Sequence, residues 1–150
     1  MRKPKLKVFL DSSALIAGIA SSKGAAREIL RLAEIGLIEV LVSRQVVVEV
    51  DRNITAKLPE CLDDFRNYLE TLAPVLVADA SQREILRFSS LIKPHDAPIL
   101  AAAVAAHADY LVTWDQKHFM TTGPRALARP KIMNPGEFLH EFRQLLHERS

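Results

Sequence analysis

Two kinds of hydrophobic pattern alternate along the chain. Short, nearly continuous apolar runs predict buried strands, and segments with apolar residues three or four positions apart predict amphipathic helices. The predicted strands cover residues 6–10, 38–43, 75–78, 109–115 and 131–133. The predicted helices cover residues 24–37, 44–58, 60–73, 81–92, 94–108 and 134–150.

This alternation of strands and helices predicts the fold class. It is typical of an α/β protein, here a three-layer α/β/α sandwich around a central, mainly parallel sheet of about five strands. We expect a single domain over residues 1–150, because that length suits one hydrophobic core. In such sheets the functional site lies beyond the carboxyl ends of the strands.

The segment 44–58 carries conflicting signals. Its sequence VVVEV is β-branched and would suit a strand. Apolar residues nevertheless recur at four-residue intervals, at Val46, Val50, Ile54 and Leu58. Ser43 is in addition a suitable N-cap. We therefore predict a helix, since the stripe continues beyond VVVEV without strand alternation.

The amino terminus has two interpretations. A basic start followed by VFLDSSALIAGIA has the outline of a secretory signal peptide. Asp11 falls inside the apolar run, however, where a charge is costly. We favour a buried strand that ends at Asp11, followed by a well-packed helix over ALIAGIA.

Composition and cysteine content favour a cytoplasmic, folded protein. Of 150 residues, 49% are hydrophobic and 25% charged, which is typical of a globular domain. Cys61 is the single cysteine, so no disulfide framework exists. The longest uncharged stretch, within 97–108, reaches about half of the ~20 residues that a membrane span needs, so we expect no membrane association. The net charge of +2 permits a polyanionic partner without requiring one.

Four acidic residues are embedded in apolar sequence, where an unpartnered carboxylate is expensive to bury. They are Asp11, Glu49, Asp96 and Asp115. Each has a local explanation: Asp96 could cap a helix, Glu49 could pair with Arg52, and the other two could be turn residues. Gathered at one sheet edge, they would instead form an all-oxygen cluster that selects Mg²⁺ or Mn²⁺ over zinc. Such sites hydrolyse phosphodiesters through metal-activated water.

Three motifs in a fixed order resemble those of a known family, the PIN-domain nucleases, which include toxins of VapBC-type toxin–antitoxin systems. The motifs are VFLDSSALIAG at 8–18, SRQVVVEV at 43–50 and HDAPILAAAVAAHADYLVTWDQKHF at 95–119. The resemblance implies that Asp11, Glu49, Asp96 and Asp115 bind Mg²⁺ or Mn²⁺ and catalyse hydrolysis. It also implies that Ser12 and Thr113 orient water or the carboxylates.

The resemblance further implies an endoribonuclease that acts on an RNA substrate and is inhibited by an antitoxin protein. We also expect a homodimer. Two other classes fit less well: a haloacid-dehalogenase phosphatase needs an acid where Ser13 stands, and a receiver domain needs an acidic pair near the first strand. A non-catalytic PIN-fold module that binds RNA or protein stays open as the alternative.

Several other polar residues have simpler expected roles. We expect basic side chains to hold the RNA backbone, with the candidates Lys5, Lys7, Lys117, Arg125 and Arg129. His118 could touch a phosphate, but base rates favour a solvated loop histidine. Asp109 is expected to serve a turn between a helix and a strand.

Overall fold

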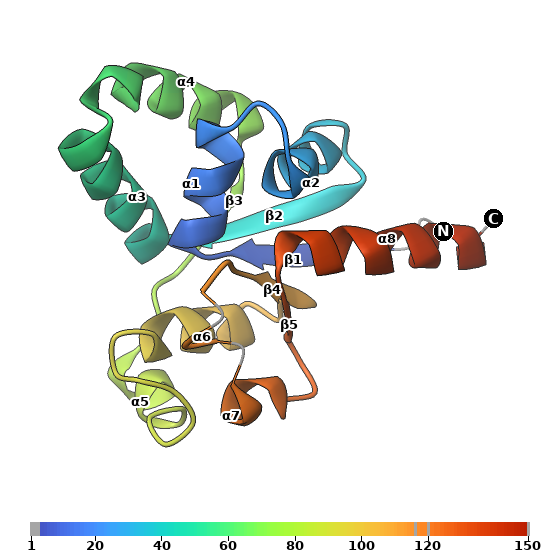
Figure 1. Ribbon diagram of the computed structural model, residues 1–150. Helices are drawn as coiled ribbons and strands as arrows, with labels where there is room; N and C mark the ends of the chain where they lie inside the picture. Colours follow the sequence, from blue (N-terminus) through green and yellow to red (C-terminus); the bar gives the residue numbers. More distant parts are fainter. Residues whose placement is uncertain (1–3, 116, 120, 150) are drawn as a thin grey trace.

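A computed structural model describes residues 4–115, 117–119 and 121–149. Within these residues, five strands form one parallel sheet in the order β3-β2-β1-β4-β5 (Figure 1). The strands are β1 (Leu6–Leu10), β2 (Ile38–Ser43), β3 (Val75–Val77), β4 (Tyr110–Val112) and β5 (Lys131–Met133). The predicted α/β class, with a mainly parallel sheet of about five strands, is confirmed.

The helices lie on both sides of this sheet. They are α1 (Ser12–Ala20), α2 (Ala25–Glu34), α3 (Arg44–Lys57), α4 (Leu62–Leu72), α5 (Gln82–Leu86), α6 (Ala97–Ala105), α7 (Thr122–Arg125) and α8 (Pro135–Arg149), with a 3₁₀ turn η1 (Pro59–Cys61). Figure 1 shows α1 to α4 above the sheet and α5 to α7 below it. In the part of the chain that the structure describes, no helix is both long and apolar enough to cross a bilayer.

The β-branched segment after Ser43 is a helix, as its periodicity predicts. The Ser43 hydroxyl accepts a hydrogen bond from the backbone N–H of Val46 at 3.3 Å, so the predicted N-cap is present. Val46, Val50 and Ile54 are all buried. Burial of this stripe outweighs the strand preference of β-branched residues, which depends on context.

Several element boundaries differ from the predictions. The predicted helix over 81–92 is only α5, and the helix predicted from residue 94 begins at Ala97. Strand β4 is also shorter than predicted and ends at Val112. The four-residue α7 lies between the predicted strands 109–115 and 131–133, where we predict no helix. Hydrophobic periodicity marks an element better than its ends, because local turns and caps decide the ends.

Strands β1 and β4 are tightly packed at their carboxyl ends, where Asp11 and Asp115 follow. Phe9, Leu10, Leu111 and Val112 are almost completely buried, and each belongs to β1 or β4. Phe9 pairs with Leu111, and Leu10 with Val112, in parallel register. Close packing on both faces therefore fixes the positions at which the chain leaves these strands.

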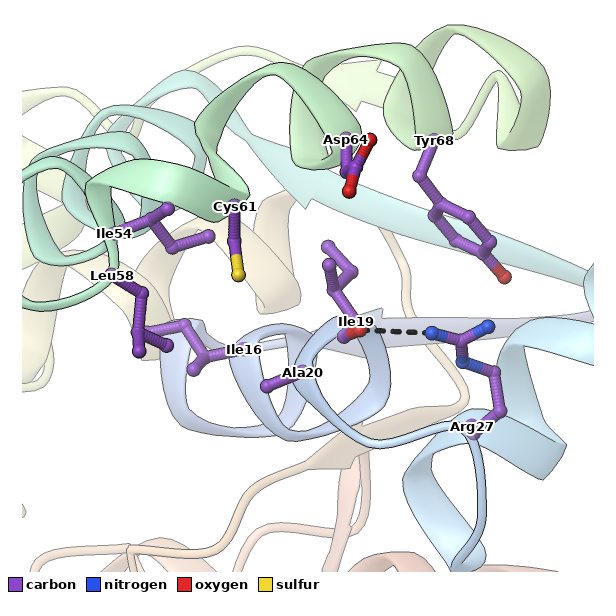
Figure 2. A pocket seen from close by; sticks show the side chains of 9 residues that line it. All are labelled: Ile16, Ile19, Ala20, Arg27, Ile54, Leu58, Cys61, Asp64 and Tyr68. Atoms are coloured by element: carbon purple, nitrogen blue, oxygen red, sulfur yellow. Dashed lines mark hydrogen bonds between the residues drawn. The ribbon is translucent and has the colours of Figure 1, made fainter.

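A pocket of about 360 Å³ separates α1 from the α3–α4 hairpin (Figure 2). Its walls are mostly apolar, and the Cys61 sulfur faces into it from η1. Arg27 closes one end: its guanidinium donates to the carbonyl oxygens of Gly18 and Ile19 and lies 4.9 Å from the ring centre of Tyr68. Arg27 thus satisfies carbonyl groups at the carboxyl end of α1, which lack partners within the helix.

Replacing Arg27 with alanine should destabilise the fold. We expect the free energy of unfolding to fall by about 2 kcal/mol, since two carbonyl groups lose a charged donor and the Tyr68 stack is lost. Urea denaturation measures this change. The matched control is Arg66→Ala, which removes an exposed ion pair with Asp51 and should leave the free energy of unfolding nearly unchanged. Equal losses in the two variants would contradict the structural role of Arg27.

Candidate active site

Asp11 is held rigidly at the carboxyl end of β1. It is only 4% exposed. Its Oδ1 accepts hydrogen bonds from the Ala14 backbone N–H at 2.9 Å and from the Ser13 hydroxyl at 2.7 Å, and its Oδ2 accepts one from the Thr113 hydroxyl. Burial raises the pKa of Asp11; the hydrogen bonds partly offset this rise, and Asp115 adds to it. Asp11 therefore caps α1 while lining the site.

Thr113 connects the ends of the two central strands. It is fully buried, and its hydroxyl donates to Asp11 while accepting the Asp115 backbone N–H at 2.8 Å. The Ser13 hydroxyl accepts the Trp114 backbone N–H at 3.0 Å. The segment after β4 is therefore positioned directly by the segment after β1.

The two serines after Asp11 differ in their contacts. Ser12 lines the pocket, but the hydroxyl that bonds to Asp11 belongs to Ser13. The resemblance pointed to Ser12 and did not single out Ser13. The spacing Asp-x-Ser before a helix could have indicated it, because a side chain two positions beyond an N-cap lies near the cap. The role of Ser12 stays a prediction.

Asp96 precedes α6 but does not cap it. Its backbone is helical and its side chain makes no capping hydrogen bond, so the local explanation for this residue fails. The residue is 6% exposed, and its Oδ2 is buried without a hydrogen-bond partner among the described residues. The closest cation-forming group is Nδ1 of His118, 3.0 Å away but not aligned for a hydrogen bond. Burial raises the pKa of Asp96, His118 opposes this, and Asp115 reinforces it.

Glu49 reaches the pocket from α3 and is half-buried. Its Oε1 accepts a hydrogen bond from the Gln45 side chain at 3.1 Å. Among the described residues no ion pair joins Glu49 to Arg52, so the second local explanation fails as well. Glu49 is therefore left facing the other acids.

His118 is not a solvated loop residue, which corrects the interpretation based on base rates. Its Nδ1 lies 3.0 Å from Oδ2 of both Asp96 and Asp115. Its backbone N–H donates to Oδ1 of Asp115 at 3.1 Å, and this hydrogen bond closes the turn between Asp115 and His118. The expectation of a pocket without nitrogen donors is therefore wrong.

All four predicted acids line one pocket of about 160 Å³. The pocket is formed by Asp11, Ser12, Ser13, Glu49, His95, Asp96, Ile99, Asp115, His118 and Phe119. Asp96, Asp115 and His118 each offer one ligand atom, and these atoms lie within 4.8 Å of one another. Asp11 and Glu49 lie outside this tight group. An orphaned, buried carboxylate oxygen among other carboxylates fits a divalent cation, which would neutralise the cluster.

The predicted basic residues lie mostly away from this pocket. Lys5 and Lys7 are at the amino end of β1, opposite Asp11, and Arg129 pairs with Asp109 at 3.3 Å. Asp109 also accepts the Lys7 backbone N–H at 2.8 Å, in keeping with its expected turn role just before β4. Lys117 alone among these lines a groove that adjoins the pocket.

A parallel α/β sheet with acids gathered at the carboxyl ends of β1 and β4 agrees with the PIN-like class of protein that the sequence motifs resemble. Residues 7–117 match the family model for the PIN domain. The chain therefore belongs to the PIN-domain family. Comparison with curated protein sequences gives no match.

Three solved structures share the fold. PAE2754 from Pyrobaculum aerophilum is 14% identical with a TM-score of 0.61, over 90% of this chain and 88% of that one. VapBC2 from Rickettsia felis, bound to a DNA fragment from its promoter, is 16% identical with a TM-score of 0.60, over 86% and 98%. FitAcB from Neisseria gonorrhoeae is 17% identical with a TM-score of 0.58, over 85% and 97%.

Proposed function

We propose that this protein is a metal-dependent endoribonuclease that hydrolyses RNA phosphodiester bonds. The observation that carries the proposal is the buried Oδ2 of Asp96, which accepts no hydrogen bond from the described residues, in a pocket lined by three further carboxylates, from Asp11, Glu49 and Asp115. A Mg²⁺ or Mn²⁺ ion held there would supply an activated water nucleophile and neutralise charge on the phosphoryl group.

The residues around Asp11 prepare its carboxylate for this task. Hydrogen bonds from Ser13 and Thr113 fix both oxygens, so the carboxylate needs no reorganisation when it engages a cation. Thr113 also fixes the backbone of Asp115, so one hydroxyl sets the spacing of two acids. Ser12, in the pocket wall, is proposed to orient water.

The substrate is proposed to approach along a groove next to the pocket. This groove, about 390 Å³ in volume, shares His118 with the acidic site. Lys93 and Lys117 line it, together with the hydroxyl-bearing Ser89, Ser90 and Thr121. Lysines and hydroxyl groups are the usual partners of phosphate oxygens. Lys93 was not among the residues proposed from the sequence.

A role as the toxin of a toxin–antitoxin pair is part of the same proposal. It is supported by the family and by the likeness in fold to VapBC2. We propose a cytoplasmic, single-domain protein over residues 1–150 that forms a homodimer and binds an antitoxin protein. A small open reading frame directly upstream, whose product copurifies with this chain, would support the pairing.

Cleavage of labelled RNA by the purified chain tests the proposal. We expect cleavage that requires Mg²⁺ or Mn²⁺, stops with a chelator, and weakens as salt rises because phosphate contacts release counterions. RNA binding without cleavage at any metal concentration would favour the non-catalytic module instead. Cleavage that persists in excess chelator would contradict the role of the acidic pocket.

A further inference from the structure

We infer that His118 is a direct ligand of the bound cation, and that its nitrogen makes the site prefer a first-row transition ion such as Mn²⁺ over Mg²⁺. This inference rests on the proposed metal site, but it assigns to that site a residue and a selectivity that four carboxylates would not provide.

The spacing of the three closest donor atoms suits one ion. Nδ1 of His118 lies 3.0 Å from Oδ2 of Asp96 and 3.0 Å from Oδ2 of Asp115. Adjacent ligands of an octahedral ion with bonds of about 2.1 Å stand about 3.0 Å apart. The imidazole nitrogen thus stands from each of the two carboxylate oxygens at the spacing of adjacent ligands on one ion, and the three donor atoms lie within 4.8 Å of one another.

The surroundings hold His118 in this position. Its backbone N–H is bonded to Oδ1 of Asp115, and the next residue, Phe119, is buried with its N–H bonded to the Asp115 carbonyl. Asp115 therefore anchors the turn through one oxygen and offers the other to the site. The buried Oδ2 of Asp96 accepts no hydrogen bond from the described residues, so it is available to a cation.

The donor chemistry decides the selectivity. Mg²⁺ favours oxygen ligands and retains its waters, whereas imidazole is a ligand for first-row transition ions. Affinity for a site with nitrogen donors rises along the transition series from Mn²⁺. One nitrogen among the oxygens should therefore favour Mn²⁺ over Mg²⁺, and Co²⁺ over Mn²⁺.

Metal binding to the full chain tests the inference without RNA. Calorimetry should show tighter binding of Mn²⁺ than of Mg²⁺. His118→Ala should lower Mn²⁺ affinity about tenfold, the lower end of the loss seen when groups supporting a metal site are removed. Mg²⁺ affinity should fall much less. The matched control is His140→Ala, because His140 is exposed on α8, outside this pocket, and its loss should leave Mn²⁺ affinity nearly unchanged.

Pulsed electron paramagnetic resonance of bound Mn²⁺ gives a second readout that needs no variant. Wild-type protein should show coupling to a histidine ¹⁴N nucleus, and labelling of histidine with ¹⁵N should change that signal. Absence of nitrogen coupling, or equal loss of Mn²⁺ and Mg²⁺ affinity in His118→Ala, would overturn the inference. Nitrogen-coupled Mn²⁺ without RNA cleavage would support His118 as a ligand and count against the ribonuclease proposal alone.

Discussion

Asp11→Asn should lower the rate of RNA cleavage by about 10²- to 10³-fold, the loss typical when a group that stabilises reacting charge is removed. Asparagine has nearly the same shape but carries no negative charge to engage a divalent cation. Its amide nitrogen also cannot accept the Thr113 hydrogen bond. The Thr113 hydroxyl would then have to reorient, and it also holds the Asp115 backbone.

The fold should survive this substitution, so the loss can be assigned to chemistry. Asparagine is as good an N-cap as aspartate, and its Oδ1 can still accept the Ala14 N–H that starts α1. Circular dichroism and the thermal midpoint would check this. Cleavage should be measured under single-turnover conditions across a range of Mn²⁺ concentrations, which separates weaker metal binding from a slower reaction.

Asp109→Asn is the matched control for Asp11→Asn. Asp109 also adjoins a central strand, but it bonds to the Lys7 backbone and to Arg129, away from the pocket. Asparagine can keep the Lys7 bond, so we expect cleavage within about twofold of wild type, since the lost partner is an exposed ion pair. If the two variants lost activity equally, a general effect on the fold would explain both, and the assignment of Asp11 would fail.

The parts of the site that depend on strand ends could be predicted from the sequence. Asp11 and Asp115 each follow an apolar run, and parallel strands bring their carboxyl ends to one edge. The roles of Glu49 and Asp96 were harder to predict, because the sequence offered a local explanation for each. Glu49 could have paired with Arg52, and Asp96 could have capped its helix. The structure removes both explanations, since Asp96 makes no capping bond and Glu49 makes no ion pair with Arg52 among the described residues.

The contacts made by loop residues could not be predicted from periodicity. His118 is brought to the acids by a turn closed through its own backbone N–H, and no hydrophobic pattern records such a turn. The bond from Ser13 to Asp11 depends likewise on the start of α1 directly after the strand. The basic candidates stay predictions: Lys117 lines the groove beside the pocket, whereas Lys5 and Lys7 lie at the other end of β1, and only the fold separates the two sheet edges.

Keeping the Asp96 carboxylate buried without a bound cation should lower the stability of the fold. Burial raises the pKa of this carboxyl, so the charged form is disfavoured in the folded state. A group whose pKa rises on folding contributes its stability below the unfolded value, near 3.8, and loses it as pH rises through the folded value. At pH 8 without a divalent cation, ionised Asp96 should therefore oppose folding.

Asp96→Asn should raise the free energy of unfolding at pH 8, in chelator, by about 1–2 kcal/mol, since it removes a buried charge whose Oδ2 accepts no hydrogen bond from the described residues. For a chain of this length that gain corresponds to a thermal midpoint about 2–8 °C higher. The gain should shrink near pH 4, where the wild-type carboxyl is increasingly protonated. Asp63→Asn, which neutralises an exposed acid on α4, should change the midpoint little at either pH.

Mn²⁺ should reverse the order of stability. It should stabilise the wild type by mass action, because the folded site binds it and the unfolded chain does not. Asp96→Asn should show little of this stabilisation, since the orphaned Oδ2 that fits a cation is gone. Two results would contradict the proposal that the buried Asp96 carboxylate serves to bind a cation. One is an Asp96→Asn variant that is less stable than wild type in chelator, and the other is a variant that Mn²⁺ stabilises as much as wild type. The buried carboxylate would then be part of the fold itself, held by groups such as His118.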